Sequence, residues 1–416
     1  MVGLVDGNNF FVSCERVVNP RLIGRPVAVL SNNDGCCVSR SNEFKARKIP
    51  MGTPYFQLKD REATGELVFC SSNYELYGDL SRRIISILRE DAVDVEQYSI
   101  DEAFIFPPSF STSAEFIDYG KRLRAKILRW VGIPCGIGFA PTKTLAKIAN
   151  HIGKKRHGGV FVMPEDPTPV LDQLPIEEVW GIGRQLSAKL HASGIHTAEQ
   201  FRRMRDDDIR HLGSVTTLRT ALELRGTPCV TDRGYDEDPD SISCSRSFGD
   251  PVTTCDALIE SIASFTAQAA TKLRKFDLLA SGANIFAQYG TACENGWTSR
   301  TVMFEHPTNA TNEMLVRISK DVPALFVNGL RYRKSGMVFF GLEKAGSARQ
   351  LDLFSTTEPH ENSKLYKTVD ALNAKFGKGA IITASEGLNG KSLWRMKREK
   401  LSRRATTNWH ELITVK

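Results

Sequence analysis

The stretch Val95-Glu96-Gln97-Tyr98-Ser99-Ile100-Asp101-Glu102-Ala103-Phe104-Ile105-Phe106 places two β-rich runs on either side of adjacent carboxylates, Asp101 and Glu102. Neighbouring side chains of a continuous strand point to opposite faces, so the two acids could not readily share a ligand there. The two-residue gap predicts a hairpin, at whose tip they can converge. A divalent cation would offset the repulsion between them. An ordinary solvated turn is the alternative.

A third carboxylate, Asp6, follows the apolar run at residues 2–5, which reads as a buried strand. Gly7 comes next and begins a tight turn. A carboxylate at a strand end beside a glycine turn is a common way to present a metal ligand. Alternatively, Asp6 caps a helix predicted to begin near Phe10.

The length and composition of the chain indicate a multidomain globular protein. Its 416 residues exceed one compact core, so we expect two to four domains, and 41% hydrophobic with 25% charged residues argues against wholesale disorder. No apolar run is long enough to cross a bilayer, and the N-terminus lacks the basic leader of a signal peptide. The nine cysteines show no Cys-x-x-Cys spacing, which predicts neither a zinc site nor a disulfide framework, and favours the cytoplasm.

Basic residues are concentrated near the C-terminus. The formal net charge is +7, and residues 391–404 contain seven Lys or Arg against one acid. Such a run favours a polyanionic partner, nucleic acid above all, although a solvated basic face is the alternative.

Residues 71–90 and 116–131 have helical apolar spacing, and a strand is predicted at 135–140. Thr142 is a plausible N-cap for the helix that follows. Lys143 and Lys147 lie four residues apart in its first turns, where the helix dipole disfavours cations, so they suggest an anionic partner. Together these elements predict a split α/β sheet layered with helices.

Residues 174–194 read as two short helices joined by the turn Gly181-Ile182-Gly183. Glycines there let backbone N–H groups approach a phosphate, and Arg184 adds positive charge. The pattern favours a DNA-binding helix-hairpin-helix; a simple αα-turn is the alternative.

The last part of the chain predicts a linker and a second α/β domain. Residues 232–240 are acidic and non-periodic, typical of a linker. Strands are predicted at 241–248, 280–288, 297–304 and 335–342, with helices at 257–276 and near 312–328. Residues 350–354 form a candidate docking peptide or a stray edge strand.

These motifs, in this order, resemble a Y-family translesion DNA polymerase. The resemblance rests on residues 98–103, Asp6 with Phe10-Phe11, residues 142–147 and the 181–183 hairpin. Residues 31–35, 71–77 and the tail extend it to the UmuC type, the catalytic subunit of bacterial DNA polymerase V. It implies a right-hand α/β multidomain architecture: palm at 1–20 and 73–165 (α+β), small fingers at 21–72, a helix-hairpin-helix thumb at 166–231, the linker at 232–240, an α/β little finger at 241–345, and a clamp-binding peptide with the UmuC-type extension at 346–416.

The resemblance also implies site residues, position by position. Asp6, Asp101 and Glu102, with the Gly7 carbonyl, would bind two Mg²⁺ ions for catalysis. Phe11 occupies the steric-gate position, where UmuC-type enzymes often carry tyrosine, and Asn42 stands where an aromatic residue is usual. The remaining implied sites are the nucleotide-binding residues Ser39, Arg40, Lys45 and Lys147, the DNA-binding residues Gly181, Gly183, Arg184, Ser245 and Arg246, and the clamp-binding residues Gln350, Leu351, Leu353 and Phe354.

The implied activity is template-directed nucleotidyl transfer past damaged bases in the SOS response. The implied partners are primer-template DNA, a dNTP, a sliding clamp, a UmuD-type accessory dimer and a RecA-type recombinase, with no membrane. The implied location is the bacterial cytoplasm, with nucleoid association during repair. Two rival hypotheses are a nucleotidyl cyclase-like enzyme, which leaves the hairpin and basic tail without purpose, and a non-catalytic DNA-binding scaffold, which does not need all three acids.

Overall fold

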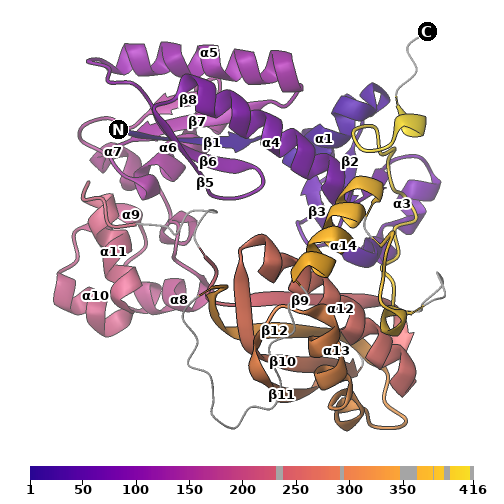
Figure 1. Cartoon of the computed structure of the whole chain (residues 1–416). Helices are drawn as coiled ribbons and strands as arrows, with labels where there is room; N and C mark the ends of the chain where they lie inside the picture. Colours follow the sequence, from indigo (N-terminus) through magenta and orange to yellow (C-terminus); the bar gives the residue numbers. More distant parts are fainter. Residues whose placement is uncertain (231–237, 291–294, 347–362, 378, 388–393, 413–416) are drawn as a thin grey trace. The chain divides into compact units, whose positions relative to one another are not determined.

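The computed structural model describes residues 1–230, 238–290, 295–346, 363–377, 379–387 and 394–412 (Figure 1). The chain forms two compact units. Unit 1 comprises Met1–Ser31, Gly35–Glu237 and Lys400–Lys416, and unit 2 comprises Asn32–Asp34 and Asp238–Glu399. Within the described residues, no helix combines the length and the apolar character that crossing a membrane requires.

Unit 1 is built on a five-stranded sheet with strand order β5-β6-β1-β7-β8. The central strand β1 pairs antiparallel with both β6 and β7, and in this register Asp6 lies opposite Glu102 on one side and Gly136 on the other. Directly opposed residues of paired strands share a face. Asp6 and Glu102 therefore project to the same side of the sheet. The strands are β1 (Val2–Gly7), β5 (Asp94–Gln97), β6 (Glu102–Phe106), β7 (Cys135–Ala140) and β8 (Val160–Val162).

The two faces of this sheet bury different helices. Val5 and Ile137 belong to the core that includes α1, α4 and α5, whereas Leu4 and Phe104 belong to the core that includes α6. Because side chains alternate along a strand, Asp6 faces the same side as Leu4. The carboxylates consequently lie on the α6 side of the sheet. The helices are α1 (Phe10–Val18), α4 (Tyr74–Asp91), α5 (Ser113–Val131) and α6 (Lys143–Arg156).

Two glycines of β7 let α6 lie close against the sheet. A Cβ atom at Gly138 would fall 2.0 Å from the backbone nitrogen of Asn150 in α6. A Cβ atom at Gly136 would fall 2.6 Å from Cγ of Lys154, whose side chain crosses that glycine. Any other residue at Gly138 would separate the helix from the strand.

A three-stranded sheet of order β3-β2-β4 and a helical segment complete unit 1. At the outer edge of β4, Leu401 forms a parallel bridge with Ser71, so a segment from near the C-terminus adds to this sheet. The sheet and its helices are β2 (Val27–Leu30), β3 (Cys37–Arg40), β4 (Val68–Ser71), α2 (Asn42–Lys45) and α3 (Lys59–Ala63). The helical segment contains α7 (Thr168–Leu171), α8 (Arg184–Ala192), α9 (Ala198–Arg202), α10 (Asp206–Leu212) and α11 (Val215–Leu224).

Unit 2 is a four-stranded antiparallel sheet, of order β11-β10-β12-β9, packed against α12 and α13. Residues from the C-terminal part join its core: Trp394 is buried against Phe265 of α12, and Arg274 of α12 pairs with Asp370 of α14 at 2.7 Å. The elements are β9 (Ile242–Val252), α12 (Cys255–Lys275), β10 (Leu278–Gly290), β11 (Asn295–Thr308), α13 (Thr311–Ser319), β12 (Tyr332–Lys344) and α14 (Ser363–Phe376).

Most predicted strands and helices are confirmed. The alternative role of Asp6 as a helix cap is excluded, because Asn9 occupies the N-cap position of α1. Two local predictions are wrong. The first helix of the predicted helix-hairpin-helix is only a 3-10 turn (Ile176–Glu178), since Pro175 precedes it and residues 179–183 leave helical geometry. The predicted two-residue hairpin at Asp101 is a longer turn, described below. The predicted linker lies largely outside the described residues.

Candidate active site

The three predicted metal-binding acids lie at one end of the five-stranded sheet. Asp6 is next to last in β1, and Glu102 is the first residue of β6, directly opposite it. Asp101 precedes β6, and its carbonyl accepts a 2.9 Å hydrogen bond from the Gly7 amide. The fold thus brings together acids that are far apart in the sequence, and it places Gly7 beside them.

Ser99 determines the shape of the turn before β6. Its hydroxyl donates to Asp101 Oδ1 at 2.6 Å and accepts from the amides of Asp101 and Glu102 at 3.2 and 3.0 Å. Because one hydroxyl satisfies both amides, residues 98–101 form a four-residue connection between β5 and β6. Glu102 therefore belongs to a strand and not to a hairpin tip, which corrects the sequence-based prediction.

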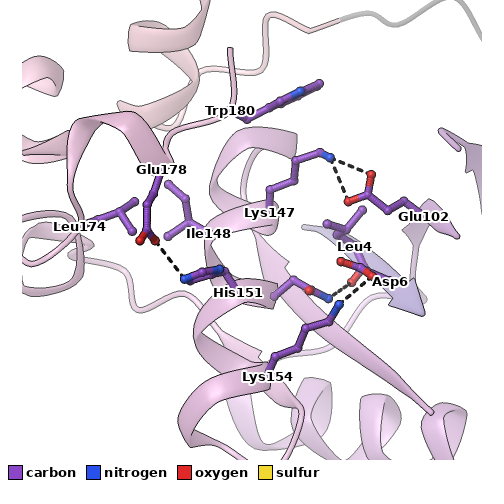
Figure 2. Close-up of a pocket in the computed structure, with 11 residues that line it drawn as sticks. Leu4, Asp6, Glu102, Lys147, Ile148, His151, Lys154, Leu174, Glu178 and Trp180 are labelled. Atoms are coloured by element: carbon purple, nitrogen blue, oxygen red, sulfur yellow. Dashed lines mark hydrogen bonds and ion pairs between the residues drawn. The ribbon is translucent and has the colours of Figure 1, made fainter. Parts of the chain in front are cut away.

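Two lysines of α6 neutralise Asp6 and Glu102 (Figure 2). Lys147 Nζ lies 3.0 and 3.1 Å from the two carboxylate oxygens of Glu102, and Lys154 Nζ lies 2.6 Å from Asp6 Oδ1. Lys143, one turn earlier in α6, pairs with Glu96 at 2.7 Å. The lysines predicted to face an anionic partner therefore have carboxylate partners within the chain.

These side chains line a cavity of about 370 Å³ in unit 1. In Figure 2 Lys147 and Lys154 reach from α6 toward Glu102 and Asp6, and Trp180 closes the wall above Lys147. The cavity therefore combines acids, ammonium groups and an indole.

Aromatic rings hold the Lys147 ammonium group in place. It lies 4.3 Å from the Tyr98 ring centroid and 5.0 Å from that of Trp180, within the range of cation–π attraction. On the other wall, His151 pairs with Glu178 at 3.0 Å, and burial lowers the pKa of His151. Residues 178–180 of the helical segment thus contact the same helix that carries the lysines.

Burial and mutual repulsion raise the pKa values of Asp6 and Glu102. In both cases burial is the largest cause. Lys154 opposes the rise for Asp6 and Lys147 opposes it for Glu102, whereas neighbouring acids of the cluster raise each pKa further. Oxygen ligands whose charges repel one another fit a hard divalent cation, which would reduce that repulsion. Among the described residues, no three His, Cys, Asp or Glu side chains already form a metal-binding group. Ser99 and the two lysines hold the carboxylates instead.

Phe11, the predicted steric gate, lies on α1 and rests on a buried aromatic residue. Its ring stacks on Tyr77 of α4, with centroids 4.5 Å apart and planes inclined by 14°. Tyr74 meets Phe11 edge-on at 5.9 Å. Phe11 itself is partly exposed, whereas Tyr77 is fully buried. One face of the gate ring is therefore fixed by α4.

Of the predicted nucleotide-binding residues of β3 and α2, Lys45 contacts the loop that follows β1. Lys45 Nζ donates to Asn9 Oδ1 at 2.6 Å, and burial followed by repulsion from Arg40 and Lys154 lowers its pKa. Arg40 donates to the Ile49 carbonyl, and the buried Ser39 hydroxyl is 3.5 Å from the Val12 amide. Attraction by Asp6 opposes the lowering of the Lys45 pKa, so Lys45 interacts electrostatically with the acid cluster, while Ser39 supports α1.

The predicted DNA-binding turn presents an open helix N-terminus. Gly181 adopts a positive φ of 89°, Gly183 is the residue before α8, and its side-chain position has no neighbour within 4 Å. Arg184 is exposed at the start of α8. The Ile182 amide is bonded to the Val179 carbonyl at 3.0 Å, whereas the Cβ position of Gly183 at the start of α8 is uncovered, which leaves room for a phosphate to approach.

In unit 2, Ser245 and Arg246 lie on β9 as predicted, but on opposite faces of the sheet. Arg246 donates to Gln268 of α12 at 3.0 Å, so it faces the helix. Ser245 faces the other side. The predicted clamp peptide, Gln350, Leu351, Leu353 and Phe354, lies outside the described residues.

Sequence reasoning missed three contributors: Ser99, Trp180 and Lys154. Lys154 follows Lys147 by seven residues, two helical turns, and this spacing was the signal that could have found it. Trp180 directly precedes the predicted Gly181-Ile182-Gly183 turn, and no local pattern assigns it to the acid cluster. Nothing in the sequence indicates that Ser99 closes the turn, because that role depends on strand register.

Comparisons with known proteins agree with this architecture. Residues 5–151 match the impB/mucB/samB family, residues 239–353 match that family's C-terminal domain, and residues 363–415 match a domain of unknown function, DUF4113. The chain is 39% identical to protein UmuC of Salmonella typhimurium over 425 residues, covering 100% of both chains. It is 32% identical to protein MucB of Escherichia coli, covering 99% of each.

Solved structures show the same fold. A Y-family DNA polymerase chimera of Dbh and Dpo4 matches 82% of this chain and 99% of its own, with a TM-score of 0.63 at 19% identity. The insertion ternary complex of Dbh DNA polymerase matches 82% of this chain and 98% of its own, with a TM-score of 0.56 at 19% identity. The full-length similarity to UmuC and the matched family domains establish the conclusion: the chain belongs to the impB/mucB/samB family, the UmuC-type Y-family translesion DNA polymerases.

Proposed function

We propose that the chain transfers deoxynucleotides to a primer, opposite damaged template bases, by two-metal-ion catalysis with Mg²⁺ in the SOS response. The observation that carries this proposal is the acid cluster: Asp6 opposite Glu102, with Asp101 joined to Gly7 by a backbone hydrogen bond. Asp6, Asp101, Glu102 and the Gly7 carbonyl would hold the ions. When bound, Mg²⁺ would polarise the attacking 3′-oxygen and stabilise the leaving pyrophosphate.

The lysines of α6 have a second role in this proposal. In the structure Lys147 and Lys154 neutralise Glu102 and Asp6. A cation bound to these acids would compete with the two ammonium groups, which would then be available to an incoming triphosphate. Lys45 lies close enough to interact electrostatically with Asp6 and would add to the same triphosphate site.

Phe11 would exclude ribonucleotides by shape. Its ring is held against Tyr77 and cannot retreat in that direction. An added 2′-hydroxyl would meet the ring, and Phe11 offers no hydroxyl of its own to bind it.

We also propose the domain roles that the family implies. The five-stranded sheet of residues 1–20 and 73–165 would be the palm, and the three-stranded sheet of 21–72 the fingers. The helices of 166–231, with Gly181, Gly183 and Arg184, would be a thumb that grips phosphates without reading sequence. Residues 232–240 would be the linker, 241–345 the little finger with Ser245 and Arg246 near the template, and 346–416 the clamp-binding peptide and extension.

Primer extension on a defined template tests the catalytic assignment. Glu102→Gln should abolish template-dependent incorporation, because the variant loses a charged ligand while keeping its shape. Glu96→Gln is the matched control, since Glu96 pairs with Lys143 just as Glu102 pairs with Lys147. The control should retain activity. If wild-type protein binds primed DNA but incorporates nothing even with the accessory dimer and recombinase, the scaffold hypothesis replaces this one.

We propose the remaining partners that the family implies, namely a sliding clamp, a UmuD-type accessory dimer and a RecA-type recombinase, and a location in the bacterial cytoplasm and at the nucleoid during repair. Changing both Leu353 and Phe354 to alanine should abolish stimulation by the clamp and spare basal extension. Equal stimulation would reject the peptide assignment.

A further inference from the structure

The steric-gate ring is connected by two side chains to a segment near the C-terminus, within unit 1. Phe11 and Glu15 lie four residues apart on α1, so they share one face of that helix. Both meet Tyr77 of α4: Phe11 stacks on its ring, and Glu15 Oε1 accepts from its hydroxyl at 2.6 Å. Two residues one turn apart on α1 therefore hold Tyr77, one at its ring and the other at its hydroxyl.

Glu15 is a fully buried carboxylate with an incomplete set of partners. Burial raises its pKa, and the hydrogen bonds from Tyr77 and Ser402 oppose that rise. Its Oε2 atom has no hydrogen-bond partner among the described residues. Burying an acid that is only partly hydrogen-bonded is costly, so its position behind the gate requires an explanation.

The segment that reaches Glu15 is bound to the rest of unit 1 by backbone and side-chain contacts. Ser71 N–H donates to the Lys400 carbonyl at 3.0 Å, and Lys400 N–H donates to Ser71 Oγ at 2.9 Å. Lys400 Nζ pairs with Glu62 at 2.8 Å. These contacts anchor the segment on the edge of β4, two residues before Ser402, which contacts Glu15.

Ser402 joins the two helices behind the gate. Its hydroxyl donates to Glu15 Oε1 at 3.2 Å and accepts from Asn73 Nδ2 at 2.9 Å. Asn73 is the N-cap of α4, with its Oδ1 accepting from the Leu76 amide, one turn before Tyr77. The chain of contacts therefore runs from Ser402 to Glu15, Tyr77 and Phe11.

We propose that Glu15 and Tyr77 are positioning residues for sugar discrimination, and that Ser402 of the C-terminal segment completes the support that fixes the Phe11 ring. This inference rests on the proposed role of Phe11 as the steric gate. It also gives a role to the segment matched as a domain of unknown function, which would tune the choice between dNTP and rNTP from behind the gate.

The test measures kcat/KM for a dNTP and the matching rNTP on one primer-template, with full-length variants and accessory factors present. Tyr77→Phe keeps the ring and removes the hydroxyl. It should raise rNTP incorporation and lower the dNTP/rNTP ratio about fivefold, the factor expected from one ordinary hydrogen bond. The dNTP value should change little. A merely structural defect would lower both values together.

Two further variants test the network. Glu15→Ala should lower the ratio like Tyr77→Phe, whereas Glu15→Gln keeps an acceptor for the tyrosine hydroxyl and should restore most of it. Ser402→Ala should lower the ratio in the same direction by a smaller factor. An unchanged ratio in Ser402→Ala would remove the C-terminal segment from the proposal.

Tyr119→Phe is the matched control, since Tyr119 is also buried in unit 1 and donates its hydroxyl to the Asp91 carbonyl at 3.0 Å, outside this network. It should leave the ratio unchanged. Phe11→Ala separates the role of the gate from the role of its support. If it does not alter the ratio, the gate assignment itself fails; if it does, while Tyr77→Phe and Glu15→Ala do not, only the role of the support is overturned.

Discussion

Replacing Gly138 by alanine should destabilise unit 1 severely. The added Cβ would lie 2.0 Å from the Asn150 nitrogen and 2.6 Å from the Ala146 carbonyl oxygen, both backbone atoms of α6. Backbone atoms cannot rotate away, so the helix must move from the sheet by more than an ångström. We expect a loss of about 3 kcal/mol or more, the upper end of overpacking costs. For a unit of this size that corresponds to a melting temperature lower by about 6–12 °C.

Gly136→Ala is the matched comparison, two residues away on the same strand and face. Its Cβ would meet Cγ and Cε of Lys154 at 2.6 and 2.8 Å, atoms of a flexible side chain. Lys154 can swing away, which costs little stability but breaks its contact with Asp6. Thermal denaturation and primer extension of both variants should therefore separate: Gly138→Ala loses stability, and Gly136→Ala keeps the fold with altered activity.

The direction of the stability change in Gly138→Ala shows whether α6 lies close against β7. Glycine weakens a strand, so without a close helix Gly138→Ala would stabilise the protein slightly. A melting temperature equal to or above that of the wild type would show that α6 does not lie against β7 as described. The positions of Lys147 and Lys154 would then lose their support.

Two other perturbations test the site. Burial raises the pKa of Asp6 and Lys154 partly opposes that rise, so Lys154→Ala should raise the pKa further. On acidification, activity that requires the ionised acid should then disappear at a higher pH than in the wild type. An unshifted acid limb of the kcat/KM profile would contradict this. The consequence for stability runs in the opposite direction: an acid whose pKa is raised by folding favours the fold below its unfolded pKa and loses that contribution as the pH rises through the folded pKa. Arg184→Ala should weaken DNA binding uniformly across sequences and reduce the slope of log K against log salt by about 1; a sequence-dependent loss would rule out a phosphate contact.

The pattern of apolar residues was sufficient to predict most of the fold. The runs at residues 2–5 and 135–140 are strands, and the helices after Thr142 and within 257–276 occur where their periodicity placed them. These elements are determined by local sequence and by burial, which a single sequence records. The apolar run at residues 2–5 likewise predicts that Asp6 lies near the end of its strand.

The parts that failed depend on register or on distant contacts. Alternation alone could not show that Ser99 would satisfy two amides and lengthen the turn before Glu102. It could not show that Lys154 crosses Gly136 to reach Asp6, because that contact needs the approach of a helix to a strand. The docking of Lys400 on Ser71 joins residues more than three hundred positions apart, and no local signal encodes it.

The edge of β4 also bears on biosynthesis. Ser71 emerges from the ribosome long before Leu401, its bridge partner, and at usual rates of about 5–20 residues per second the delay is roughly 15–65 s. Throughout that interval the outer edge of the three-stranded sheet is unpaired, and all of residues 238–399 must be translated first. A nascent or prematurely terminated chain would therefore offer an open strand edge to chaperones or to other chains, whereas the folded chain covers that edge with residues 400–401.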